Sequence, residues 1–114
     1  MLEQFKVQPE DQVRVTEDNL RKTVEAVFAK MGLDDSDSAL GADVLVKADM
    51  RGVDTHGVSN MLRSYVTGYG NGELNSHPNW TITRETPSTA NIDGDRGLGI
   101  IVTPKAMDIA IEKA

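Results

Sequence analysis

The spacing of hydrophobic residues predicts three amphipathic helices in the first two thirds of the chain. Apolar side chains recur three and four residues apart, which places them on one face of a helix. The first helix is expected to begin after an N-cap at Thr16 and to end at Gly32 in a Schellman motif. The second is expected between an acidic cap at residues 34–36 and Gly52, and the third after Gly57. Their predicted buried stripes are Leu20, Val24, Val27, Phe28 and Met31; Leu40, Val44, Leu45 and Ala48; and Val58, Met61, Leu62, Tyr65, Val66 and Tyr69.

The pattern changes to alternation after residue 79. Residues 80–85 read as a half-exposed strand rich in β-formers, and residues 89–93 can return as a second strand. Proline is favoured at the first position of a helix, so a last helix is predicted to begin at Pro104. The predicted buried face of that helix consists of Ala106, Met107, Ala110, Ile111 and Ala114. The expected fold class is α+β, an N-terminal helical segment with a small β-ribbon.

The predicted elements divide the chain into three parts. Residues 1–15 form an N-terminal arm, and residues 16–70 form a three-helix segment that carries a Thr-His-Gly motif. Residues 71–114 contain the ribbon, a glycine loop and the start of a helix. The buried stripe of this last helix reaches Ala114 without a glycine, asparagine or proline stop. We therefore expect further polypeptide, in the same chain or another, to cover it.

Composition narrows the classes of function. The chain has 114 residues, which suits one small domain, and a net charge of −6 without a basic run, which argues against nucleic-acid or anionic-membrane partners. It has no cysteine, which excludes disulfides and thiolate metal sites and favours a cytoplasmic location. No stretch has the length of a membrane span or the core of a signal peptide. We expect no metal site.

The residues best suited to chemistry are Thr55, His56 and Gly57, at the start of the third predicted helix. Unsatisfied backbone N–H groups and the positive end of the helix dipole gather there, which suits an anion. An imidazole held by Thr55 can donate a proton to a developing alkoxide. Alternatively, His56 is a solvated or capping residue, and spacing alone does not decide between the two.

The glycine loop at residues 94–99 resembles half of a phosphate-binding loop. A complete G-x-G-x-x-G motif requires glycine where Val102 stands, and no βαβ unit surrounds the loop. We therefore predict a tight turn with close packing, and no Rossmann fold.

Three segments closely resemble the type 2 malate/L-lactate dehydrogenase family: residues 48–58 (ADMRGVDTHGV), 91–94 (NIDG) and 106–114 (AMDIAIEKA). The similarity runs from the first helix to the end of the chain. Members, which include ureidoglycolate and sulfolactate dehydrogenases, interconvert 2-hydroxy and 2-oxo acids with NAD or NADP on a non-Rossmann cofactor domain. The resemblance implies the N-terminal part of such an enzyme, acting on a small 2-hydroxy or 2-oxo acid as a homodimer. It leaves open NAD versus NADP, the substrate side chain and the direction.

The resemblance also implies roles for four residues. The family motif is Ser-His-Gly, with the histidine as proton donor and the serine in a relay, and these roles fall on His56 and Thr55. Many members bind the substrate carboxylate through an arginine four residues after the histidine, where this chain has Asn60. Arg63 shares a helix face with Asn60 and can substitute for that arginine. No cofactor-binding residue is assigned.

Length sets this chain apart from the family, whose members are far longer. The resemblance implies that most of the dinucleotide-binding part and a second histidine-containing segment lie outside these 114 residues. We therefore expect residues 1–114 alone to be inactive. The alternative is a non-catalytic truncated product or a module that dimerises through its helices.

Overall fold

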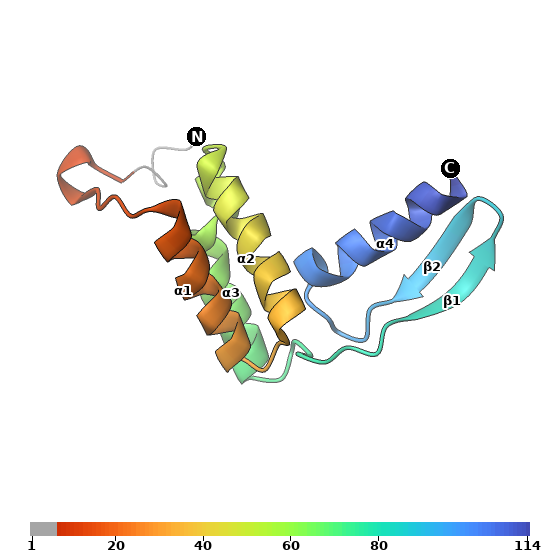
Figure 1. Ribbon diagram of the computed structural model, residues 1–114. Coiled ribbons are helices and arrows are strands. Elements are labelled where there is room, and N and C mark those ends of the chain that lie inside the picture. The colour runs from red at the N-terminus through yellow and green to blue at the C-terminus, as the bar shows by residue number, and fades with distance from the viewer. Residues whose placement is uncertain (1–6) are drawn as a thin grey trace.

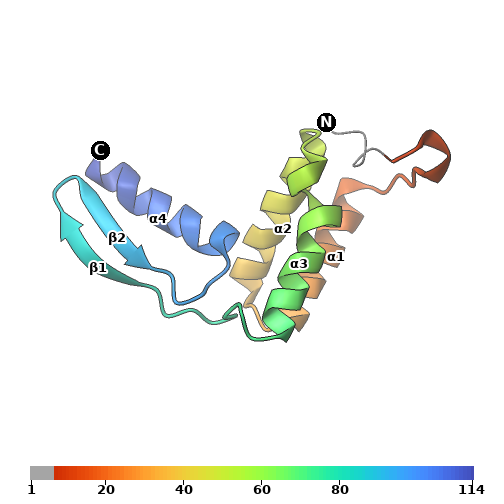
Figure 2. The same ribbon diagram turned by 180° about the vertical axis from the view of Figure 1, so that it is seen from behind.

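The computed structural model describes residues 7–114, which form two lobes (Figures 1 and 2). The helical lobe is a bundle of α1, α2 and α3, and the ribbon lobe is an antiparallel β1–β2 pair with α4 beside it. The elements are η2 (Pro9–Asp11), α1 (Glu17–Lys30), α2 (Asp35–Met50), η3 (Asp54–His56), α3 (Val58–Gly70), β1 (Thr81–Thr86), β2 (Thr89–Asp93) and α4 (Gly99–Lys113). The α+β class is confirmed, and the described residues contain no parallel sheet.

The predicted helix N-termini are confirmed by their caps. The Thr16 hydroxyl accepts the backbone N–H of Asn19 at 3.4 Å, and the Asp34 carboxylate accepts that of Asp37 at 2.8 Å. Each cap satisfies one of the amides that the first turn leaves without a partner. Of the predicted N-terminal arm, residues 7–15 are exposed and residues 1–6 lie outside the described part.

Glycine ends the first two helices, as predicted. Gly32 has φ +99° and Gly52 has φ +72°, the left-handed conformation that a side chain disfavours. The next residue then donates its N–H back to the helix: Leu33 bonds to the carbonyl of Phe28 at 3.2 Å. Val53 closes α2 in the same way, and this second ending leads directly into the candidate site.

The core lies mainly between α1, α2 and α3. On α1, Val24 and Phe28 are fully buried as predicted, whereas Val27 is outside the core. Every predicted stripe residue of α3 except Val66 packs against the core. The buried cluster consists of Val24, Phe28, Leu33, Ala42, Leu45, Leu98 and Ile101.

The predicted face of α2 is wrong in part. Leu45 is buried as expected, but the other predicted positions are only partly buried. The buried positions of α2 are Asp37, Ser38, Gly41, Ala42, Leu45 and Val46. A Cβ on Gly41 would lie 2.8 Å from the Phe28 ring, so small residues on α2 let α1 approach closely. A pattern based on large apolar side chains does not detect this contact.

The predicted start of α4 is wrong, and the face predicted to be buried is largely uncovered within residues 7–114. The helix begins at Gly99, five residues before Pro104, because its first turn is anchored by buried Leu98 and Ile101. Met107 is 55% exposed and Ile111 is 65% exposed. Within residues 7–114, only the first part of α4 meets the core of the helical lobe.

Two ion pairs hold the ribbon lobe in place. Lys113 Nζ lies 2.7 Å from Glu85 Oε1, which ties the end of α4 to the ribbon. Lys105 Nζ lies 2.9 Å from Asp37 Oδ1 and joins α4 to the first turn of α2.

Burial of the Tyr69 side chain, with Asp37 nearby, raises the pKa of Tyr69 to about 12. The strand β2 has the predicted bounds, whereas β1 begins and ends one residue later than predicted and is exposed along its whole length instead of half-exposed.

The glycine loop forms a tight turn with close packing, as predicted. A Cβ on Gly97 would lie 2.6 Å from Val102, so this glycine allows close approach. The left-handed residues of the turn are Asp95 (φ 49°) and Arg96 (φ 57°). The Asp95 carboxylate stabilises the turn by accepting the side-chain amide of Asn75 at 2.9 Å.

Candidate functional site

The Thr-His-Gly motif lies where α2 ends and α3 begins, at the end of the bundle away from the link to β1 (Figure 2). Backbone hydrogen bonds hold this short connection. Val53 N–H donates to the carbonyl of Ala48 at 2.9 Å, and His56 N–H donates to the carbonyl of Val53 at 2.9 Å. His56 is therefore presented on a hydrogen-bonded turn between two packed helices.

The His56 side chain is exposed and contacts its neighbour. Thr55 Oγ1 lies 2.9 Å from His56 Nδ1. When Nδ1–H donates to the threonine hydroxyl, Nε2 is the ring nitrogen that is free to take up a proton. The protonated ring can then donate that proton from Nε2.

Asn60 and Arg63 lie on the first two turns of α3, and both are exposed. The Asn60 side-chain nitrogen donates to the carbonyl of Asp54 at 2.8 Å, so it stabilises the turn that carries His56. The Arg63 guanidinium has no hydrogen bond or ion pair within residues 7–114. Of these two, Arg63 is the cation available to a carboxylate.

The positive end of α3 is already occupied by a carboxylate of the chain itself. Asp49, on the last turn of α2, accepts the backbone N–H of Val58 through Oδ2 at 3.0 Å. The sequence predicts that this helix end suits an anion, and in the structure a carboxylate of the chain itself lies there. No local pattern in the sequence indicates this role of Asp49, because the contact spans nine residues and depends on how α3 folds back on α2.

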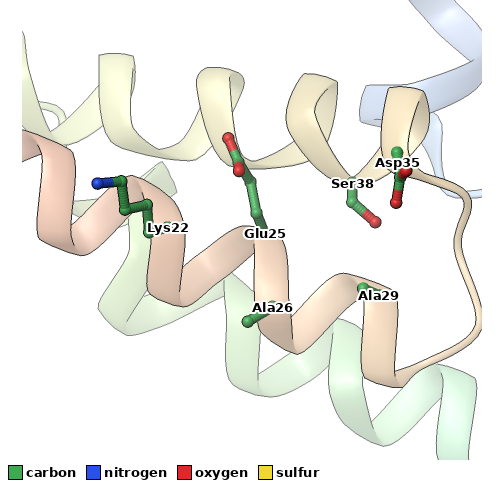
Figure 3. Close-up of a pocket in the computed structure, with 6 residues that line it drawn as sticks. All are labelled: Lys22, Glu25, Ala26, Ala29, Asp35 and Ser38. Atoms are coloured by element: carbon green, nitrogen blue, oxygen red, sulfur yellow. The ribbon is translucent and has the colours of Figure 1, made fainter.

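A hollow of about 330 Å³ lies between α1 and α2 (Figure 3). Its lining residues are Lys22, Glu25, Ala26, Ala29, Asp35 and Ser38. Asp35 and Ser38 are on the first turn of α2, whereas His56 follows the last turn of that helix. A helix of 16 residues is about 24 Å long. The hollow is therefore separate from the His56 turn.

The described residues show few other binding features. Within residues 7–114, no group of three acidic or histidine side chains could hold a metal ion. No helix in that part of the chain combines the length and apolar character needed to cross a bilayer. In the glycine loop, the amides of Asp95 and Gly97 already donate to Asp93 and Gly94, so they are not free to bind a phosphate.

Comparison with known proteins identifies the family. The sequence model of malate/L-lactate dehydrogenase matches residues 15–114. The chain belongs to this family. The resemblance noted from the sequence is thereby confirmed.

Relatives in the malate/L-lactate dehydrogenase family share both sequence and fold with the chain. A malate dehydrogenase of Pyrococcus abyssi is 46% identical over 105 residues, covering 92% of this chain and 29% of the relative. An L-sulfolactate dehydrogenase of Methanocaldococcus jannaschii is 41% identical over 85% of this chain and 28% of the relative. The structure of malate dehydrogenase from Pyrococcus horikoshii matches with a TM-score of 0.86 at 45% identity, over 90% of this chain and 29% of that one. The chain thus spans less than a third of the length of these dehydrogenases.

Proposed function

We propose that the complete protein containing this chain is an NAD(P)-dependent oxidoreductase that interconverts a 2-hydroxy acid and its 2-oxo acid. His56 is its proton donor and acceptor, Thr55 holds the imidazole, and Arg63 binds the substrate carboxylate. Membership of a family whose relatives are named malate and sulfolactate dehydrogenases supports the reaction class. The observation that carries the proposal is the 2.9 Å contact of Thr55 with an exposed His56.

In the direction of reduction, the carbonyl carbon of the 2-oxo acid receives a hydride and its oxygen receives a proton. A nicotinamide cofactor, when bound by the complete protein, would supply the hydride. Protonated His56 donates its Nε2 proton to the developing alkoxide, while Nδ1–H donates to the Thr55 hydroxyl, so the ring is left neutral. In the direction of oxidation, Nε2 of that neutral ring accepts the proton.

We assign the carboxylate to Arg63 in preference to Asn60. Asn60 already uses its side-chain nitrogen to brace Asp54, and its remaining oxygen is an acceptor, as is a carboxylate. The Arg63 guanidinium is unpaired within residues 7–114, and its planar shape can form two parallel hydrogen bonds to a carboxylate.

Arg63→Lys is expected to raise KM for the acid by about tenfold, with a smaller change in kcat. Lysine keeps the charge but loses the two-pronged geometry. Steady-state kinetics with each substrate acid checks this. Arg21→Lys is a matched control, because Arg21 pairs with Glu17 and Asp43 on another side of the bundle. An unchanged KM with every acid would remove Arg63 from the site.

The reaction class itself is tested with a panel of substrates. The complete protein is assayed for NADH and NADPH consumption with the 2-oxo counterparts of malate, lactate and sulfolactate. We expect turnover with at least one acid and one cofactor. No turnover with any combination would favour the non-catalytic alternative.

The surfaces of the chain support the proposal that further polypeptide covers it. Its accessible surface is 7824 Å², against about 6,100 Å² expected for a compact monomer of this mass. Its radius of gyration is 16.1 Å, against about 13 Å for a compact domain of this length. Met107 and Ile111 contribute exposed apolar surface on α4. We propose that the rest of the complete protein and a second subunit cover these surfaces.

Residues 1–114 expressed alone are therefore expected to self-associate or to unfold without a sharp transition, and to bind NAD(P)H weakly or not at all. Analytical ultracentrifugation, calorimetry and cofactor titration check this. A sharp transition from a dilute monomer, or tight cofactor binding, would contradict it.

A further inference from the structure

We propose that Asp49 is a positioning residue for His56: its carboxylate caps α3 and fills the space above Gly57, and so fixes the turn that presents the imidazole. The expected effect of Asp49 on kcat rests on the proposed function. The capping of α3 by Asp49 does not, because it involves only residues of this chain.

The first observation is the cap itself. The residue before α3 is Gly57, which has no side chain to accept the free amides of the first turn. Asp49 Oδ2 instead accepts the backbone N–H of Val58 at 3.0 Å. A carboxylate at this position also complements the positive end of the helix dipole. Because Asp49 belongs to α2, this contact joins the two helices across the His56 turn.

The second observation explains the glycine. Gly57 has φ −87° and ψ −169°, an extended conformation that any residue can adopt. A Cβ at this position would nevertheless overlap the carboxylate of Asp49. The glycine of the Thr-His-Gly motif is therefore required by the side chain above it, and not by its backbone angles.

The third observation is that the turn is held on both sides of His56. Asp49 fixes the amide two residues after the histidine, and Asn60 fixes the carbonyl of Asp54, two residues before it. Asp49 does not act through the imidazole directly, because His56 Nδ1 is paired with Thr55. Its influence passes through the backbone, and a shift of about 1 Å in a reacting group can cost a hundredfold in rate.

Kinetics of the complete protein test the proposal. Asp49→Ala is expected to lower kcat about tenfold or more, with KM for the cofactor within about twofold. Asp49→Asn is expected to stay within about threefold, because its amide oxygen can still accept from Val58. Asp43→Ala is the matched control: Asp43 is also on α2, but it pairs with Arg21 and Lys47 and does not contact the turn. A kcat for Asp49→Ala within about twofold of the wild type would overturn the proposal.

A double-mutant cycle tests the pairing of Asp49 with Gly57. Gly57→Ala alone is expected to lower kcat by a factor similar to that of Asp49→Ala. The double variant is expected to be no worse than either single one, because removing the carboxylate makes room for the new methyl group. Fully multiplicative losses would show that the two residues act independently and would overturn the proposal.

Hydrogen exchange separates this inference from the proposed function. In Asp49→Ala, the backbone amides of residues 58–61 are expected to exchange about tenfold faster or more, with no change in α1. This result is obtained whether or not the protein reduces 2-oxo acids, so an inactive wild type would refute the proposed reaction and leave the cap intact. Unchanged exchange would overturn the cap. Should Asp49→Ala fail to fold, a tenfold loss of kcat or the same faster exchange in Asp49→Asn would overturn the proposal.

Discussion

Replacing His56 with alanine is expected to lower kcat of the complete protein by a factor on the order of 100 or more. A positioned proton donor acts mainly in the transition state, so the affinity for the cofactor should change much less. Since the side chain is exposed and contacts only Thr55 among the described hydrogen bonds, its loss should not disturb the fold. Steady-state kinetics and cofactor titration measure the two quantities separately.

His77→Ala is the control for this experiment. His77 is the other histidine of the chain and lies exposed in the segment before β1. Its removal should leave kcat within about twofold. Near-normal turnover of His56→Ala, with an unchanged dependence on pH, would instead mean that His56 is a solvated turn residue.

Phe28→Ala is expected to destabilise the protein by about 3–5 kcal/mol. Phe28 is 0% exposed, and its ring fills the space that Gly41 leaves between α1 and α2. Alanine would leave a cavity at the closest contact of the helical lobe. This loss is a large fraction of the roughly 5–15 kcal/mol that stabilises a typical domain. Urea unfolding of the complete protein, followed by circular dichroism, measures the change.

Two further variants define the outcome for Phe28. Phe28→Leu should cost much less than Phe28→Ala, since it removes less volume and keeps the site apolar. Val13→Ala should have almost no effect, because Val13 is 86% exposed. A loss below about 1 kcal/mol for Phe28→Ala would contradict the central place of this ring in the core.

Local signals in the sequence predicted the helix ends because the interactions that form them are local. Thr16 and Asp34 accept amides three residues ahead, and Gly32 and Gly52 allow the left-handed step that ends a helix. These contacts depend on residue type and short separation, both of which are visible in a sequence.

The wrong predictions concern positions whose burial is set by packing between helices. Gly41 and Ala42 are buried because α1 comes close, and no count of large apolar residues detects that. Pro104 suggested a helix start, but burial of Leu98 and Ile101 extends α4 by five residues. Met107 and Ile111, on the face of α4 predicted to be buried, are exposed within the described part of the chain, so burial of that face would need the further polypeptide that the sequence predicts.

In the candidate site, too, contacts between neighbours in the sequence were predicted and contacts between helices were not. The sequence placed His56 beside Thr55 at the start of α3, and the structure shows their contact. Asn60 was expected at the substrate, and the structure shows its amide bracing the turn. Asp49 went unnoticed because it reaches Val58 only after α2 and α3 pack together.

Proton donation by His56 is tested most directly by a single turnover. The complete protein is loaded with NADH or NADPH, whichever it uses, and mixed with a saturating 2-oxo acid while nicotinamide absorbance is recorded. We predict that His56→Ala binds both ligands yet oxidises the cofactor on the order of a hundredfold more slowly, and that added imidazole restores part of the rate because the site is open to solvent. Oxidation of the cofactor at the wild-type rate by His56→Ala would contradict the assignment.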